Sequence, residues 1–459
     1  MRPTIALLLA GSALVPSPAA AQSVDLEAVQ EQIASMQAEI ARLTAQVNEL
    51  QAREQARTAI PTSTPTANPT PAAAAPAPAT APTAPAIAWK GAPEISAPGG
   101  WSFKPRGRLQ IDSGIIDAPS TIAGDSLGTA TEFRRVYLGM DGTLPGGFGY
   151  RIEADLANSG VELTDVYLTY KPSREVTLTL GQQKPFWGLE ELTSDLFTPF
   201  MERGAFNSAF GFERRVGLSG AYAGKDILVQ LGAFTDNAAD LNADTNNSYS
   251  FDGRIVFAPH VGDGQLHLAA SAHARDFNDA STTVRYRARP FLHTTDVRLV
   301  DTKAFSATGE RSFGIEAAYI QGPFHVTFEG HRITALRPGL PNPTFQGGYA
   351  EVGMLLTGGD KTAYRGGVYD RIRPVHPVSE GGIGAIQLNA RYDYLDLIDN
   401  GIVGGKQQTA GLSAIWIPIE YVRFVVNYGH LWIDDAAVPA GTDPDYSVDT
   451  FGLRAQLDF

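Results

Sequence analysis

The chain has 459 residues and a formal net charge of −13, with 47 Gly, 30 Pro, 19% charged residues and no cysteine. The lack of cysteine excludes disulfides, thiolate metal sites and cysteine nucleophiles. The length fits two or three ordinary domains or one large all-β body with extensions, and the Gly-rich, weakly charged composition favours the second.

The first residues have the pattern of an export signal. Arg2 precedes an apolar run from Ile5 to Val15, and Ala19 and Ala21 stand at the spacing of a cleavage site. This predicts a secretory signal peptide over residues 1–21. A membrane anchor is the weaker interpretation, because the run is too short to span a bilayer. No other stretch reaches 18 apolar residues, so the exported chain is either soluble or enters a membrane as strands.

Residues 22–57 carry apolar side chains alternately three and four positions apart, with Gln, Glu and Arg between them. This heptad seam predicts a coiled coil, and therefore an oligomer whose strand number the seam does not fix. The seam residues are Leu26, Val29, Ile33, Met36, Ile40, Leu43, Val47 and Leu50.

Residues 58–100 begin with an uncharged Pro/Ala/Thr tract, "TAIPTSTPTANPTPAAAAPAPATAPTAPA". Such a tract is an extended, semi-rigid spacer. We therefore expect a linker between the coiled coil and the rest of the chain.

From residue 101 the apolar residues recur at every second position, as in "YRIEADL", "LTDVYLTY", "AIQLNARYDY" and the terminal "FGLRAQLDF". Gly, Asp, Asn and Pro clusters separate about 16 such segments, which predicts a strand for each. A soluble β-sandwich also alternates. Charges of both signs on one face, and aromatic residues near the segment ends on the other, favour an antiparallel 16-stranded transmembrane β-barrel over residues 101–459.

A series of stretches resembles the phosphate-selective porin O and P family across most of residues 101–459. In order, they include "FRRVYLGMDGTLPGGFGYRIEADL", "LTDVYLTYKP", "GQQKPFWGLEELTSD", "FMERGAF", "RYRARPFLHTTDVRLVDTKAF", "FGIEAAYIQGPFHV" and "YAEVGMLLTGGDKTAY". The resemblance implies a homotrimer in the outer membrane of a Gram-negative bacterium, with loops folded into each lumen. Phe459 is similar to the C-terminal assembly signal of such porins, and the coiled coil would lie in the periplasm.

The resemblance also implies the residues of a narrow anion path. The family's paired arginines match Arg134 and Arg135, its aspartate matches Asp165, its basic residue before the inward loop matches Lys184, and its loop arginine matches Arg203. Neighbouring Arg134 and Arg135 cannot both face the lumen from a regular strand, so one of them needs a bulge, a rim position or an acidic partner. For each residue the competing interpretation is an ordinary wall charge paired across strands.

The stretch "TTVRYRARPFLH" places Arg285, Arg287 and Arg289 at alternate positions, so an extended chain would point all three guanidiniums the same way. Such a ladder of donors could pass an anion from one guanidinium to the next, and Arg298 would extend it if the segment folds back. Alternatively, the ladder pairs with acids of the lumen. These acids are Asp112, Glu153, Glu316, Glu351 and Asp393.

No catalytic motif of the kinds GxSxG, HExxH, GxxxxGK[ST] or GxGxxG occurs, so we expect no enzyme and no cofactor or metal. The leading hypothesis is a passive outer-membrane porin for small anions, phosphate or polyphosphate foremost, narrowed by residues 187–213 and 285–298. Only eight of the 36 basic residues are Lys, which leaves open a general or sugar-type porin. Two further hypotheses stay open: a tether to peptidoglycan or another periplasmic partner through the coiled coil, and a soluble secreted β-protein. Nothing in the sequence indicates that the chain binds nucleic acid.

Overall fold

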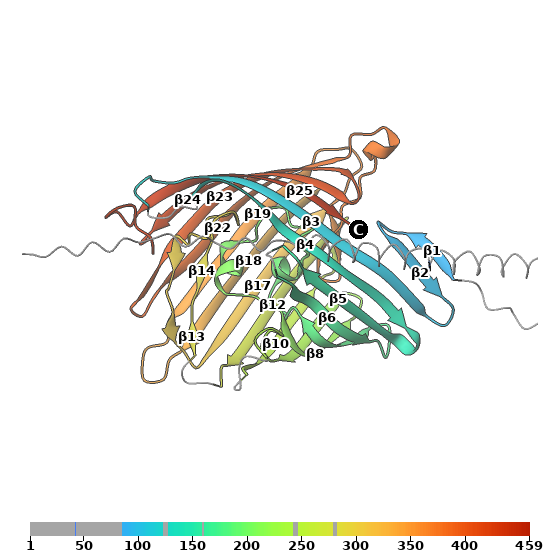
Figure 1. The fold of residues 1–459 in the computed structure, drawn as a ribbon, viewed down its shortest axis with the longest axis horizontal. Helices are drawn as coiled ribbons and strands as arrows, with labels where there is room; N and C mark the ends of the chain where they lie inside the picture. Colours follow the sequence, from blue (N-terminus) through green and yellow to red (C-terminus); the bar gives the residue numbers. More distant parts are fainter. Residues whose placement is uncertain (1–41, 43–84, 123–126, 158–159, 242–246, 279–281) are drawn as a thin grey trace, which may run out of the picture. The chain divides into compact units, whose positions relative to one another are not determined.

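Each long strand pairs with the next along the chain until the last one meets the first. The computed structural model describes Arg42 and residues 85–459 except 123–126, 158–159, 242–246 and 279–281. Within this part of the chain, β25 (Tyr446–Asp458) pairs antiparallel with β3 (Trp101–Asp117), and sixteen antiparallel strands close into a barrel (Figure 1). The predicted 16-stranded antiparallel barrel is thereby confirmed.

The fourteen other barrel strands follow one another between β3 and β25. They are β4 (Gly128–Leu144), β5 (Phe148–Asp155), β6 (Glu162–Tyr170), β7 (Val176–Gln183), β8 (Arg215–Ala223), β9 (Ile227–Phe234), β10 (Tyr249–Phe257), β12 (Gly264–Asp276), β17 (Gly309–Gln321), β18 (Phe324–Leu336), β19 (Thr344–Leu355), β22 (Ala385–Asp399), β23 (Ile402–Ile419) and β24 (Val422–Asp434). We call the end of the barrel that holds Phe459 the C-terminal rim and the opposite end the distal rim.

A short hairpin precedes the barrel. β1 (Ala86–Trp89) pairs with β2 (Pro93–Ala97), and β2 continues the sheet by pairing with β3. Residues 86–97 were expected to belong to the linker; instead the alternating Ile87 and Trp89 add an edge to the sheet. The predicted signal peptide, coiled coil and Pro/Ala tract lie outside the described residues, apart from Arg42 and the last two residues of the tract, Pro85 and Ala86. None of the described helices is long and apolar enough to cross a membrane.

The two faces of the barrel wall differ as the alternation predicts. Outward-facing Phe451, Leu453 and Leu457 of β25 are each more than 40% exposed, whereas the inward Arg454 and Gln456 between them are buried. A wall with its apolar side chains outside and its polar side chains inside is what a lipid-embedded barrel around a polar lumen requires.

Three connections fold into the lumen. Residues 184–214 carry α2 (Leu189–Leu192) and α3 (Ala205–Ala209), and the described residues of the second connection, 277–278 and 282–308, carry β13 (Thr283–Val284), β14 (Arg287–Ala288), β15 (Val300–Asp301) and β16 (Phe305–Ser306). The third connection, residues 356–384 at the C-terminal rim, carries β20 (Ala363–Arg365), β21 (Val368–Asp370) and the 3-10 turn η2 (Val378–Glu380); sequence alternation did not predict it. The remaining elements are η1 (Pro145–Gly147) and β11 (His260–Val261).

Part of the inner wall is apolar, which the simple alternation rule does not predict. Ile333, Phe345 and Leu431 point inward near the distal rim and are fully buried, because Tyr286 and Leu292 of the second loop pack in the same cluster. Burying such side chains against a loop gives roughly 1.5–3 kcal/mol each relative to exposure. The loops are therefore held by hydrophobic packing as well as by polar contacts.

Four inward-facing glycines on adjacent strands make room for this packing. In the strand registers Gly411 pairs with Gly429, and Gly452 pairs with Gly114. A Cβ atom at Gly429 would lie 2.5 Å from the ring of Phe291, and one at Gly452 would lie 2.7 Å from a methyl of Leu292. We call Gly114, Gly411, Gly429 and Gly452 the glycine trough.

Candidate functional site: a constriction between two cavities

Two cavities meet inside the lumen. One, of about 560 Å³, is lined by residues of the C-terminal rim such as Asp458, and we call it the C-terminal chamber. The other, of about 150 Å³, is lined by Arg289 and His293 of the second loop, and we call it the distal chamber. Both cavities are lined by Arg135, Glu191, Asp195 and Arg203. We call these four residues the constriction.

The loop of residues 184–214 brings the acidic side chains to the constriction. Leu189 of α2 is fully buried against Ala318 and Ile320 of the wall. Next to it, Glu190 forms an ion pair of 2.5 Å with Arg391 and accepts a hydrogen bond from the Gly204 N–H. These contacts fix both ends of the loop segment that carries Glu191, Asp195 and Glu202.

Glu190 is an unusual carboxyl group because it is buried among other acids. Burial raises its pKa to about 7; Arg391 opposes this rise, whereas Glu329 and Glu351 add to it. The group anchors the loop and does not line either chamber.

Arg134 and Arg135 both reach the lumen because β4 has a bulge there. The register with β3 pairs Gln110 with Arg135 and Ile111 with Phe133, so Arg134 is the extra residue. Each arginine also has an acidic partner: Arg134 donates two hydrogen bonds, of 3.0 and 3.1 Å, to Glu202, and Arg135 pairs with Asp195. Of the three possibilities that the sequence analysis offered, the structure has two: the bulge at Arg134 and an acidic partner for each arginine.

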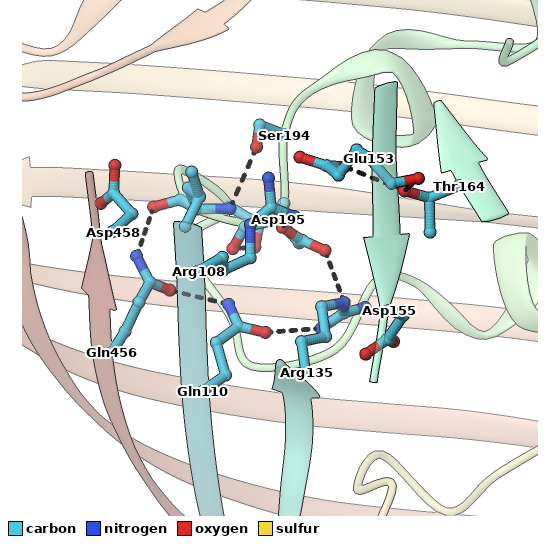
Figure 2. Close-up of polar contacts among 12 residues, drawn as sticks. Arg108, Gln110, Arg135, Glu153, Asp155, Thr164, Ser194, Asp195, Gln456 and Asp458 are labelled. Atoms are coloured by element: carbon cyan, nitrogen blue, oxygen red, sulfur yellow. Dashed lines mark hydrogen bonds and ion pairs between the residues drawn. The ribbon is translucent and has the colours of Figure 1, made fainter. Parts of the chain in front are cut away.

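Asp195 lies between two guanidiniums. Arg135 Nε is 2.6 Å from its Oδ2, and Arg108 pairs with its Oδ1. Figure 2 shows the two arginines approaching Asp195 from β4 and β3, with Gln110 joining Arg135 to Gln456. Burial alone would raise the pKa of Asp195, but Arg108 and Arg135 hold it well below its usual range. Asp195 is therefore charged at every physiological pH.

Lys184 and Arg203 are held by the same loop. Lys184 Nζ lies 2.7 Å from Glu191 Oε1, and burial and the charge of Arg203 lower the pKa of Lys184 to about 8. Arg203 donates to the carbonyl oxygens of Glu190, at 3.0 Å, and Thr193, at 2.9 Å. Part of the Arg203 guanidinium thus serves to shape the loop.

Asp165 lines the C-terminal chamber but is not among the four residues of the constriction. It accepts a 2.6 Å hydrogen bond from Arg214 and lies 3.8 Å from Arg151. Its nearest cations are therefore wall and loop residues that the sequence analysis did not single out.

The alternating arginines of the second loop differ in their surroundings. Tyr286 and Ala288 are buried while Arg285 and Arg287 are exposed, as the alternation predicts. Arg285 pairs with Asp301 of the same loop. Arg289 donates to Asp296 at 3.0 Å and lines the distal chamber.

Arg298 joins the far end of this row. Burial and the neighbouring charges of Arg289 and Arg287 lower the pKa of Arg298 to about 10. Arg298 therefore lies near enough to Arg287 and Arg289 for their charges to act on it, whereas Arg285 pairs with Asp301. The lumen acids named as possible partners of the ladder are occupied elsewhere: Asp112 pairs with Arg454, Glu316 with Arg254, Glu351 with Arg391 and Glu153 with Arg106, and Asp393 accepts from the Ala205 N–H.

A second basic row lies on β3, and the sequence analysis did not identify it. Lys104, Arg106 and Arg108 alternate in "FKPRGRLQID" and all three line the C-terminal chamber. The sequence pattern that could have identified this row is the same alternation of basic residues that is seen at Arg285, Arg287 and Arg289. The loop of residues 356–384 adds Arg371, which pairs with Asp458 and lies over the rings of Phe197 and Tyr421.

The C-terminal chamber is locally cationic although the chain is acidic overall. Of the described residues that line it, eleven are Lys or Arg and six are Asp or Glu, an excess of five positive charges. The distal chamber has four Arg and three acidic lining residues. Fixed charge in a narrow cavity acts mainly on solutes inside it, so the overall charge of −13 does not decide what the lumen favours.

The arrangement can bind and release charged solutes but offers no chemistry of bond making. Among the described residues no group of three or more His, Asp or Glu side chains could hold a metal ion. Guanidiniums facing a water-filled cavity offer paired donors to an anion, while nearby carboxylates keep each contact exchangeable.

Comparison with known proteins identifies relatives of the whole barrel. The model of the phosphate-selective porin O and P family matches residues 103–459. An uncharacterised protein of Caulobacter vibrioides is 42% identical over 478 aligned residues, covering 99% of this chain and 95% of that protein. Porin O of Pseudomonas aeruginosa is 26% identical over 399 aligned residues, covering 78% of this chain and 89% of that protein. The outer-membrane protein OmpT of Vibrio cholerae shares the fold, with a TM-score of 0.51 and 12% identity over 80% of this chain and all of that one.

Proposed function

The chain belongs to the phosphate-selective porin O and P family, and from that premise we propose that this outer-membrane porin passes small anions, phosphate or polyphosphate foremost, through its arginine-lined constriction. As a member of a family of channels, it is not an enzyme. The observation that carries the proposal is the excess of five positive charges lining the C-terminal chamber, which meets the distal chamber at Arg135 and Arg203.

Passage takes place by exchange of partners. An anion in the distal chamber meets Arg289 and Arg134, both of which already hold carboxylates, Asp296 and Glu202. A guanidinium has donors enough to bind a second anion beside the first, so the solute moves along without any arginine becoming unpaired. The resident carboxylates weaken each contact, which lets the solute leave again.

The same carboxylates favour a second candidate, a general or sugar-type porin with little anion selectivity. At the constriction Arg135 and Arg203 face Asp195 and Glu191, so the four residues carry no net formal charge. Weak selectivity would follow if this neutral ring, rather than the cationic chamber, controls passage.

Assembly into a homotrimer and a periplasmic role for residues 22–57 belong to the same proposal. Removal of residues 22–86 tests them: a role in assembly or tethering predicts loss of the trimer or of cell-wall attachment, while the purified barrel still conducts. A trimer unchanged by the deletion, with attachment also unchanged, contradicts both roles.

The decisive experiment is the single-channel reversal potential in a salt gradient, with phosphate titrated against chloride current. We expect anion preference, block by phosphate, and a loss of preference in Arg289→Gln that exceeds the loss in Arg285→Gln, because Arg289 lines the distal chamber and Arg285 pairs with Asp301 outside it. Cation preference at neutral pH would refute the anion proposal. No preference and no phosphate block would support the general porin.

A further inference from the structure

The outer face of the barrel has a groove over four neighbouring strands. A cavity of about 490 Å³ lies across β17, β18, β19 and β22, on the side of the wall that faces the membrane. Its floor includes Gly330 and Gly348, which pair directly in the β18–β19 register. Its sides include Phe313, Phe328 and Tyr392, all more than 45% exposed.

The groove forms because Gly330 and Gly348 have no side chains. Large outward side chains such as Phe313, Phe328 and Tyr392 stand around the paired glycines, which leave a strip of the wall without any side chain between them. A groove of this kind, mostly apolar and open to the bilayer, suits an acyl chain.

One end of the groove is cationic. Arg332 lines it, points outward and is exposed, and it forms no ion pair with any residue that the structure describes. Arg311 on β17 is its diagonal neighbour, because Arg332 pairs with Phe313 and Arg311 with Thr334. The described contacts of the Arg311 guanidinium go to the carbonyl oxygens of Arg275 and Glu310, at 2.8 Å each, and not to a carboxylate.

Two cations without acidic partners on a lipid-facing surface need an anion from outside the barrel. An unpaired charge on this surface is costly within the hydrocarbon, and the cost falls towards the interfaces. Arg332 stands four positions before the end of β18 at the distal rim. Most of the long connections leave from that rim, which is the arrangement of the extracellular side of such barrels. A lipid phosphate lies at that level of a bilayer, and guanidiniums bind phosphate in the bidentate manner.

We propose that this groove is a binding site for a phospholipid whose headgroup carries a net negative charge. One acyl chain lies over Gly330 and Gly348 between the aromatic side chains, and the phosphate group binds Arg332, with Arg311 beside it. The proposal does not depend on which solute passes through the lumen.

The test uses the full chain, purified in mild detergent, stripped of lipid and studied by native mass spectrometry with added phosphatidylglycerol or phosphatidylcholine. Gly330→Leu should fill the groove without straining the wall, because a Cβ atom there meets nothing closer than the ring of Phe328 at 3.6 Å. Arg332→Gln should remove the charge and leave the groove. Matched controls are Ala455→Leu, also outward on the wall, and Arg174→Gln, exposed at the other rim.

We expect the wild type to hold phosphatidylglycerol in preference to phosphatidylcholine. Gly330→Leu should weaken the binding of both lipids about tenfold, Arg332→Gln should abolish the preference, and the controls should stay within about twofold of the wild type. Heat-resistant migration in gels checks that each variant is folded. Equal lipid binding in all variants would overturn the proposal. If Gly330→Leu instead dissociated the oligomer and left lipid binding intact, a second copy of the chain would be the occupant, and the lipid site would be refuted.

Discussion

Asp195 is one of the two acidic residues of the constriction. Its single negative charge pairs with both Arg108 and Arg135 at the point where both chambers meet. We expect Asp195→Asn to raise the anion-to-cation permeability ratio roughly threefold, because it removes one negative charge where the two chambers meet. Reversal potentials measure this ratio.

Glu175→Gln is the matched control for this substitution, since Glu175 is exposed in a turn at the C-terminal rim. If Asp195→Asn lowered anion preference or left it unchanged, Asp195 would not control the field in the constriction.

Lys184 gives the lumen a dependence on pH. Burial and the charge of Arg203 lower the pKa of Lys184 to about 8, so this lysine is charged at pH 7 and loses its charge as the pH rises to 9. We expect anion conductance to fall across this interval, with a step centred near pH 8.

In Lys184→Arg the step near pH 8 should vanish while selectivity at pH 7 remains, because arginine stays charged throughout. A step that persists in Lys184→Arg would assign it to another group, of which Glu190, with a pKa of about 7, is the first to examine.

At the scale of elements, the second inward loop depends on the glycine trough. In Gly429→Val a side chain would enter the space that the ring of Phe291 occupies. Forcing extra methyl groups into a packed interior costs about 1–3 kcal/mol, so we expect the loop to be displaced and the single-channel conductance to rise. Conductance histograms in planar bilayers test this.

Gly220→Val is a suitable control, because a Cβ atom at Gly220 lies at an ordinary 3.4 Å from a methyl group of Leu178. An unchanged conductance in Gly429→Val, together with full stability, would mean that the loop does not require the trough.

The strands were predictable from the sequence because their alternation is a local property. The same rule indicated the need for a device at Arg134 and Arg135, which the β4 bulge supplies. The alternation rule would also have predicted that the basic row ending in Arg108 on β3 faces the lumen, but this row was recognised only in the structure. By contrast, Glu191 and Asp195 lie in an irregular loop, where the sequence pattern does not tell which way a side chain points. Their contacts with basic side chains therefore depend on how distant parts of the chain pack together.

The inward apolar residues show where the alternation rule fails on the barrel wall itself. Phe345 and Leu431 occupy positions that the alternation assigns to a polar lumen. They are apolar because loop side chains, and not water, cover them. A prediction from one strand at a time has no means of seeing that cover.

At the scale of the whole molecule, the seam between β3 and β25 joins the first and last strands of the barrel. Arg454 donates two hydrogen bonds of 2.7 Å to Asp112 across it and another of 2.6 Å to the Met201 carbonyl oxygen. Removal of one partner leaves a buried charge unpaired, so we expect Arg454→Gln to lower the free energy of unfolding by about 3–5 kcal/mol.

The midpoint of urea unfolding and the temperature at which the folded band disappears from gels measure this loss. The double variant Arg454→Gln with Asp112→Asn should recover much of it, because neither side chain is then charged. A single variant as stable as the wild type would show that the seam does not need this pair.

The same seam sets an order of events in assembly. The glycine trough takes Gly114 from the first barrel strand and Gly452 from the last, so half of it does not exist until those strands meet. Bringing together segments so distant in sequence is the slow step of folding, and contacts that depend on it form afterwards. Leu292, which packs at both Gly114 and Gly452, therefore reaches its complete set of contacts only in a barrel that has already closed. We therefore expect the lumen of a newly closed barrel to narrow only afterwards, when the second loop docks.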